Sequence, residues 1–282
     1  MKKIRVAGVP EHFNLPWHLC IEDGEFSEKN LEVKWTDVPE GTGKLCQMLR
    51  NNETDVAVIL TEGIVKDILA GNDSKIVQVY VQSPLIWGIH VDANSRFENI
   101  SELENTTVAI SRKGSGSQLM AYVNAGNLGW NPENLKFEIV NTIDGAVESL
   151  AAGTSDYFMW ERFMTKPLVD AGIFRKIGEC PTPWPCFVIA VKNDFLAQNK
   201  AEIDNLLQII NQKTAHFKQI ENIGTMLATR YNQQETDILE WLSLTEWSQE
   251  KLTPETLNNV QNQLLQLGLI EKKGNFAEIA IS

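Results

Sequence analysis

The segment Glu11-His12-Phe13-Asn14 places a carboxylate, an imidazole and an amide just before a helix that starts near Pro16. His12 could act as a proton shuttle or a metal ligand, since histidine serves in both roles. However, His18 follows at a spacing that fits no standard zinc motif. We therefore expect no metal site and no catalytic site. We expect ligand contact or helix capping from four residues of this segment: Glu11, His12, Asn14 and Trp17.

Two later segments of the first third are also candidates. Gly41, Thr42 and Gly43 precede a helix, where backbone N–H groups could bind an anion, or where the glycines form only a tight turn. Neither the G-x-x-x-x-G-K-[ST] nor the G-x-G-x-x-G spacing is present, so no cofactor is expected. Thr61 and Glu62 end an apolar run. An exposed Glu62 would pair with a cationic ligand or cap the next helix.

The second half of the chain offers comparable segments. Ser115, Gly116 and Ser117 open a helix whose partial positive charge suits an anion or a carbonyl group. Trp160 and Glu161 end another apolar run. Trp184 stands in a proline-stiffened loop and either stacks on a ligand or plugs the core. Ser83 and Trp87 complete the candidate set, at a point where the chain passes between two lobes.

The elements that must position these residues form a repeated pattern. A strand over 4–9, a helix over 16–25, a strand over 31–35, a helix over 44–51 and a buried strand over 56–60 predict a doubly wound α/β sheet. The same order recurs over 107–160, with Asp156 matching Asp55 at an offset of 101 residues. We therefore expect two α/β lobes with their ligand loops at the carboxyl ends of the strands, lining one cleft.

The lobe boundaries follow from the apolar runs between the repeats. Strands over 76–81 and 85–91 meet near Ser83, and a return crossing is expected at 187–191. This places the first lobe at 1–83 and 188–282 and the second at 84–187. The tail is helical, and its expected apolar stripes are Leu206, Ile209 and Ile210, then Leu239, Leu242 and Leu244, then Leu257, Val260, Leu264 and Leu267.

Composition excludes several classes of protein. A formal charge of −12 argues against nucleic acid as a partner, because phosphate binding needs a basic surface. No run of apolar residues is long enough to insert into a membrane. The four cysteines form no C-x-x-C pair and are expected to be buried thiols, with a Cys180–Cys186 disulfide as the alternative. We expect a cytoplasmic protein, or a periplasmic one if a signal segment has been removed.

The chain also resembles a known family. Strand 4–9, the loop 11–17, the run Thr54-Asp55-Val56-Ala57, the helix start at 113–118 and the helical tail resemble type-2 periplasmic-binding proteins, in the branch that binds nitrate, sulfonates and pyrimidine precursors. The opening residues 5–17 are similar to a subfamily of bacteria and fungi that includes a Candida protein likened to thiamine-biosynthesis proteins. The C-C-C-F-C cluster of yeast-type pyrimidine-forming enzymes has no counterpart here.

The resemblance implies a two-lobed solute-binding protein that closes on a small polar or heteroaromatic molecule, with membrane subunits of an ABC transporter as implied partners. The alternative is an enzyme of thiamine-pyrimidine or menaquinone precursor synthesis on the same fold, in which Glu11, His12 and Glu161 would supply acid–base groups. We favour binding over catalysis, because no catalytic motif of the related enzymes can be transferred residue by residue to this sequence.

Overall fold

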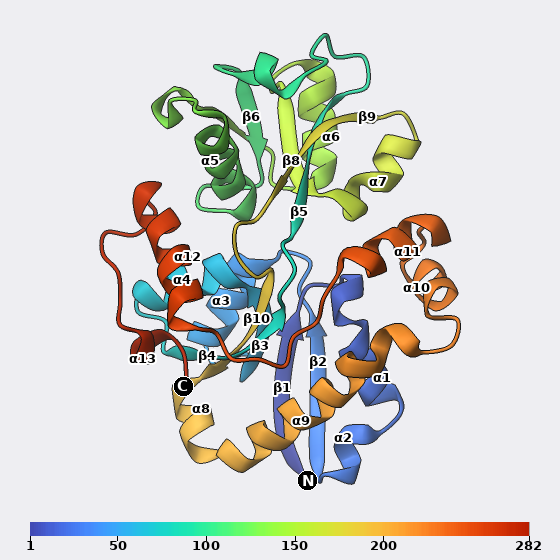
Figure 1. The fold of residues 1–282 in the computed structure, drawn as a ribbon, viewed down its shortest axis with the longest axis vertical. Coiled ribbons are helices and arrows are strands. Elements are labelled where there is room, and N and C mark those ends of the chain that lie inside the picture. The colour runs from blue at the N-terminus through green and yellow to red at the C-terminus, as the bar shows by residue number, and fades with distance from the viewer. Residues whose placement is uncertain (282) are drawn as a thin grey trace. The chain divides into compact units, whose positions relative to one another are not determined.

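Two five-stranded sheets in the computed structural model, which describes residues 1–281, share one strand order (Figure 1). The orders are β2-β1-β3-β10-β4 and β7-β6-β8-β5-β9. In each sheet the first three strands are parallel, and the fourth, β10 or β5, is antiparallel to both of its neighbours. The strands are β1 (Lys2–Gly8), β2 (Leu31–Asp37), β3 (Val56–Leu60), β4 (Ser74–Val81), β5 (Ile86–Asp92), β6 (Thr107–Ile110), β7 (Lys136–Ile139), β8 (Tyr157–Glu161), β9 (Phe174–Pro181) and β10 (Phe187–Lys192).

Helices connect the parallel strands. Because the crossover from β1 to β2 and the crossover from β2 to β3 run in opposite directions across the sheet, right-handed connections place α1 and α3 on opposite faces of the first sheet. The connecting helices are α1 (Leu15–Glu22), α2 (Glu25–Glu28), α3 (Thr42–Arg50), α4 (Thr61–Leu69), α5 (Gly116–Leu128), α6 (Ile143–Ala152) and α7 (Arg162–Asp170), with short 3-10 turns at η1 (His12–Asn14), η2 (Ile100–Leu103) and η3 (Pro132–Asn134).

The last third of the chain is helical, as the sequence predicts. In Figure 1, α9 runs beside α1, and α12 runs beside α4. The segments are α8 (Asn193–Gln198), α9 (Lys200–His216), η4 (Phe217–Gln219), α10 (Ile223–Tyr231), α11 (Glu235–Leu244), α12 (Pro254–Gln266) and α13 (Phe276–Ile279). Within residues 1–281, no helix is both long and apolar enough to cross a membrane.

The chain divides into two compact units. Unit 1 comprises residues 1–83 together with the chain from Trp184 onward, and unit 2 comprises residues 84–183. The sequence predicts that the first lobe resumes at residue 188, whereas in the structure Trp184 already belongs to unit 1. The physical reason is that Trp184 bonds to Glu62 there, and Thr61 Oγ1 donates to the carbonyl of Pro185.

The predicted repeat is present at the level of single hydrogen bonds. Asp55 accepts the backbone N–H of Arg5, and Asp156 accepts the backbone N–H of Thr107, over 2.9 and 2.8 Å. The two aspartates stand 101 residues apart, each just before the buried strand β3 or β8. The N-caps of α3 and α6, Gly41 and Thr142, keep the same offset. Each unit therefore repeats one β-α-β-α-β design.

Two expectations about helices are wrong. The helix expected over 16–25 is split into α1 and α2, because Gly24 adopts a left-handed conformation with φ of 75° that interrupts the helix. On α11 the buried stripe is Ile238, Trp241 and Leu242, while Leu239 is 52% exposed. The expected stripe of Leu239, Leu242 and Leu244 is wrong because these residues do not follow the i, i+3, i+4 spacing of one helix face. The stripes on α9 and α12 are buried up to Leu264.

Candidate functional site

The carboxyl ends of β1, β2 and β3 carry the candidate residues of unit 1. Parallel neighbouring strands end at the same edge of a sheet, which is where α/β proteins bind ligands. Glu11 to Asn14 follow β1, Gly41 to Gly43 open α3 after β2, and Thr61 and Glu62 are the first two residues of α4 after β3. The fold thus brings three sequence-predicted segments to one edge.

Thr42 and Gly63 tie two of these segments together. A β-carbon at Gly63 would collide with the Thr42 side chain, so the first turns of α3 and α4 are in direct contact. Gly41 adopts φ of 76° at the N-cap of α3, a conformation that favours glycine. Gly41 therefore forms the tight turn that the sequence allowed, while Gly43 is the second residue of α3.

Glu62 and Trp184 form a buried pair. The Trp184 indole Nε1 donates to Glu62 Oε2 over 2.7 Å, and the two residues are 3% and 4% exposed. The expectation that Glu62 is exposed is therefore wrong, because Trp184 and the first turn of α4 enclose it. Burial raises the pKa of Glu62 to about 7, against the opposing effects of its own backbone N–H, Trp184 and Lys66.

The loop Glu11–Asn14 is held by aromatic residues from distant parts of unit 1. The carbonyl of Phe13 accepts hydrogen bonds from Tyr80 Oη and Trp247 Nε1, over 2.8 and 3.2 Å. The carbonyl of Glu11 accepts one from Tyr231 Oη over 3.4 Å. Two donors on one carbonyl, both from fully packed rings, fix the backbone of this loop.

Glu11 and His12 have shifted pKa values. Burial raises the pKa of Glu11 to about 7. Burial lowers the pKa of His12 to about 3, which the neighbouring Gln233 side chain opposes, so His12 is neutral at physiological pH. The His12 ring packs 4.2 Å from the Trp241 ring, centroid to centroid. This environment is that of a core histidine, and it stabilises the loop.

The other two candidates of unit 1, Trp17 and Ser83, make contacts within that unit. Trp17 is 0% exposed and packs against Phe26, Trp35 and Tyr80. Ser83 Oγ accepts the backbone N–H of Glu246 over 3.0 Å. Both residues therefore make structural contacts within unit 1.

Unit 2 presents three buried hydroxyls where β6 leads into α5. Ser115 is the N-cap of α5 and accepts the backbone N–H of Gln118. Ser117 Oγ lies 3.0 Å from Ser115 Oγ and accepts the backbone N–H of Ser111, also over 3.0 Å. Gly116, the first residue of α5, lies between them. This arrangement concentrates hydroxyl and N–H groups at a helix N-terminus, where a polar group is stabilised.

The end of β8 carries the remaining candidates. Glu161 is the N-cap of α7 and accepts the backbone N–H of Met164 over 2.7 Å. Trp160 stacks on Phe158, and its ring meets the Trp87 ring edge-on at a centroid distance of 6.1 Å. Trp87 is 5% exposed, while Trp160 is half-buried. Trp160 is thus the more accessible of the two rings.

Sequence reasoning missed the residues that hold the Glu11–Asn14 loop. Tyr231, Trp241 and Trp247 lie more than 200 residues along the chain from that loop. Their aromatic character was visible, but nothing in a single sequence pairs them with it. The density of tryptophan in α11 and the segment after it was the only available signal.

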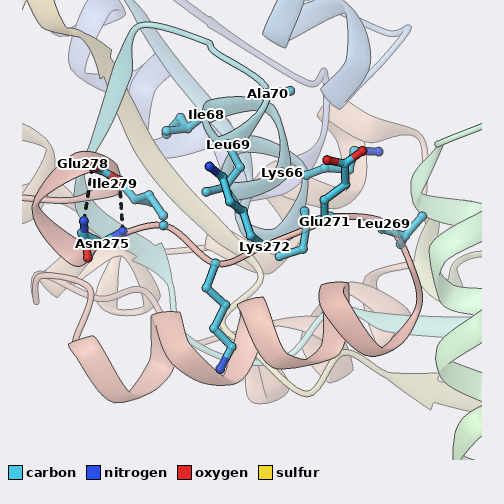
Figure 2. Close-up of a pocket in the computed structure, with 13 residues that line it drawn as sticks. Lys66, Ile68, Leu69, Ala70, Leu269, Glu271, Lys272, Asn275, Glu278 and Ile279 are labelled. Carbon is cyan, nitrogen blue, oxygen red and sulfur yellow. Dashed lines mark hydrogen bonds between the residues drawn. The ribbon is translucent and has the colours of Figure 1, made fainter.

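A hollow of about 710 Å³ lies elsewhere in unit 1 (Figure 2). The end of α4, with Lys66 and Leu69, faces the segment 269–279, in which Asn275 and Glu278 bond to each other at the start of α13. None of the sequence-predicted candidates lines this hollow. Within residues 1–281, no group of three or more His, Cys, Asp or Glu side chains is arranged to hold a metal ion.

Comparison with known proteins agrees with this architecture. Residues 87–180 match the family described as Ca3427-like PBP, a group of periplasmic-binding proteins. The structure of the Candida albicans CA3427 gene product is 26% identical, with a TM-score of 0.90, and the match covers 100% of this chain and 96% of that one. This chain has the periplasmic-binding-protein fold.

Two further members of this fold are more distant in sequence. The alkanesulfonate-binding protein SsuA from Xanthomonas axonopodis pv. citri, bound to MOPS, is 13% identical, with a TM-score of 0.83 and coverage of 100% and 98% of the two chains. The ligand-binding component of an ABC-type import system from Staphylococcus aureus, with zinc bound, is 14% identical, with a TM-score of 0.75 and coverage of 100% and 97%. No curated protein matches the chain in sequence.

Proposed function

We propose that this periplasmic-binding-protein-like chain is a solute-binding protein, which binds a small polar or heteroaromatic metabolite and releases it unchanged. The observation that carries the proposal is the repeated edge of the two sheets. In unit 1 this edge holds Glu11, Thr42 and Glu62, and in unit 2 it holds Ser117 and Glu161. Polar groups at helix N-termini, beside a few aromatic rings, are typical of small-molecule sites.

The proposal extends to partners. Periplasmic-binding-type structures similar to this chain include a ligand-binding component of an ABC-type import system. Membrane subunits of such a transporter are therefore the proposed recipients of the ligand. Closure of the two units on the ligand remains a prediction.

A thermal-shift screen against a panel of metabolites tests the binding function. A ligand at one hundred times its Kd adds about 2.7 kcal/mol to the free energy of unfolding, which for a chain of this size raises Tm by roughly 5 °C. We expect at least one compound to raise Tm in a concentration-dependent way. If no compound does so, the proposal is wrong.

One observation favours an enzyme as the second candidate. A carboxyl group with a pKa near 7, such as Glu11, suits acid–base catalysis at neutral pH. Against this, the neighbouring His12 is buried and neutral. Mass spectrometry of the stabilising compounds after incubation separates the two functions, because only an enzyme converts them.

A further inference from the structure

Glu11, in the loop after β1, and Glu62, in the first turn of α4, lie at one edge of the unit 1 sheet. Glu11 follows β1 and Glu62 follows β3, and these strands are hydrogen-bonded neighbours through the pairs Val6–Val56 and Ala7–Ala57. Glu11 is half-buried, and burial raises the pKa of its carboxyl group to about 7. A partly desolvated carboxylate is stabilised when a cation pairs with it.

The Glu62 carboxylate is held by an indole. A carboxylate offers about four lone-pair sites, and Trp184 Nε1 occupies one of them at Oε2. The other contributions are the Glu62 backbone N–H and a weak effect of Lys66, one helical turn further along α4. Trp184 thus fixes the orientation of the carboxylate and leaves it able to accept further hydrogen bonds.

Asn14 adds another acceptor to this edge. Its Nδ2 donates to the carbonyl of Val9 over 2.8 Å, which determines which end of the amide is the oxygen. Asn14 Oδ1 is then a buried acceptor, in a residue that is 0% exposed, with no donor among the described residues. Buried acceptors in proteins almost always have a donor, so this oxygen is an acceptor whose donor is absent from the described residues.

The arginines of unit 1 are already paired with carboxylates. Arg5 bonds to Asp55, Arg50 to Asp67 and Arg230 to Glu22. The arginine side chain is the usual recognition group for carboxylates, sulfonates and phosphates, and here all three are engaged elsewhere. This edge therefore offers acceptors for hydrogen-bond donors, and no arginine to bind an anion.

We infer that unit 1 recognises a protonated amine or amidine on the ligand, with the Glu62 carboxylate, oriented by Trp184, as its acceptor and with Glu11 and Asn14 contributing further acceptors. This inference rests on the proposed solute-binding function and names the class of solute. It separates this chain from the sulfonate-binding structure with the same fold, whose bound MOPS carries a sulfonate.

Pairs of probes that share a ring and differ in charge test the inference. Suitable pairs are tryptamine with indole-3-acetate, histamine with imidazole-4-acetate, and 3-(aminomethyl)pyridine with nicotinate, with MOPS as the sulfonate. Calorimetric titration at pH 8 measures Kd for the wild-type protein. We expect saturable binding by ammonium probes, with a Kd at least tenfold lower than that of the matched carboxylate.

Two substitutions and one control test whether the preference for ammonium probes depends on the Glu62–Trp184 pair. Glu62→Gln keeps an acceptor for the Trp184 indole but removes the charge, and we expect it to raise the Kd of ammonium probes at least tenfold. Trp184→Phe removes the orienting donor and should raise Kd several-fold. Glu28→Gln is the control. Glu28 is exposed on α2, which precedes the amino end of β2, whereas the candidate residues follow the carboxyl ends of the strands. This substitution should therefore leave Kd unchanged.

The outcomes distinguish this inference from the proposed function. Tighter binding of the carboxylate or sulfonate probes, with no effect of Glu62→Gln, would overturn the cationic class while supporting solute binding. Absence of binding by every probe and by every compound of the metabolite screen would overturn both. The wild-type comparison of matched probes needs no variant, so it stands even if a substitution impairs folding.

Discussion

The imidazole ring of His12 and the indole ring of Trp241 lie 4.2 Å apart, centroid to centroid, although 229 residues of chain separate them. Trp241 also packs against Phe13 and Trp247. Through this contact α11 positions the loop between β1 and α1, which carries Glu11 and Asn14. The helical tail therefore supports the proposed binding site, because its aromatic side chains pack against the loop that carries Glu11 and Asn14.

Truncation of Trp241 should be severely destabilising. Trp241→Ala removes a ring that is 1% exposed, and we expect a loss of about 3–5 kcal/mol in the free energy of unfolding. Leu239→Ala, on the exposed side of the same helix, is the control and should cost less than about 1 kcal/mol. Urea denaturation measures both. Equal effects would mean that α11 does not depend on its aromatic contacts.

His12 should make the protein sensitive to acid. Its pKa is about 3 in the folded state, against 6.5 for an ordinary histidine, so the unfolded state binds more protons between these values. Stability should therefore fall as pH drops below 6.5, by about 2 kcal/mol between pH 7 and pH 5. His12→Phe should flatten this part of the stability curve. His216→Phe, at a histidine exposed on α9, is the matched control substitution.

Glu62 should act in the opposite direction. Its pKa of about 7 in the folded state lies above the ordinary 4.5, so the folded state binds more protons between these values. Stability should fall as pH rises from 4.5 to 7, by on the order of 3 kcal/mol. Glu62→Gln should therefore be more favourable at pH 8 than at pH 5. An identical effect of Glu62→Gln at both pH values would contradict the buried environment of this carboxylate.

The two repeated aspartates should differ in their importance. Asp55 accepts a backbone N–H and also pairs with the Arg5 guanidinium, whereas among residues 1–281 the Asp156 carboxylate has the equivalent backbone bond from Thr107 and no ion pair. We expect Asp55→Asn to cost about 2 kcal/mol and Asp156→Asn less than about 1 kcal/mol. A double-mutant cycle that combines Asp55→Asn with Arg5→Met measures the interaction energy between the Asp55 and Arg5 side chains. A coupling energy near zero would show that the pair contributes no stability.

Much of this fold could be predicted from sequence, because local patterns carry it. The buried run at 56–60 and the offset of 101 residues between Asp55 and Asp156 identify the repeat directly. The apolar spacing within each repeat is a local signal, and secondary structure depends strongly on local spacing. The offset of 101 residues then shows that the same local pattern occurs twice. The antiparallel placement of β10 between β3 and β4 could not be predicted in this way, because strand pairing joins distant segments.

The candidate site was predicted as a set of loops and not as a set of contacts. Glu62 and Trp184 were both singled out, but their hydrogen bond joins residues 122 positions apart, and no pattern in the sequence pairs them. Trp17 illustrates the opposite difficulty. A tryptophan before a helix suits either a ligand or the core, and only packing against Phe26, Trp35 and Tyr80 distinguishes the two.

Calorimetric titration of the most stabilising compound from the metabolite screen, followed by mass spectrometry of the recovered compound, tests whether the protein binds a solute without converting it. We expect one molecule bound per chain, a Kd raised by substitutions at Glu62, and chemically unchanged compound after incubation. A chain that binds no compound saturably, or one that converts the compound into a product, would contradict it.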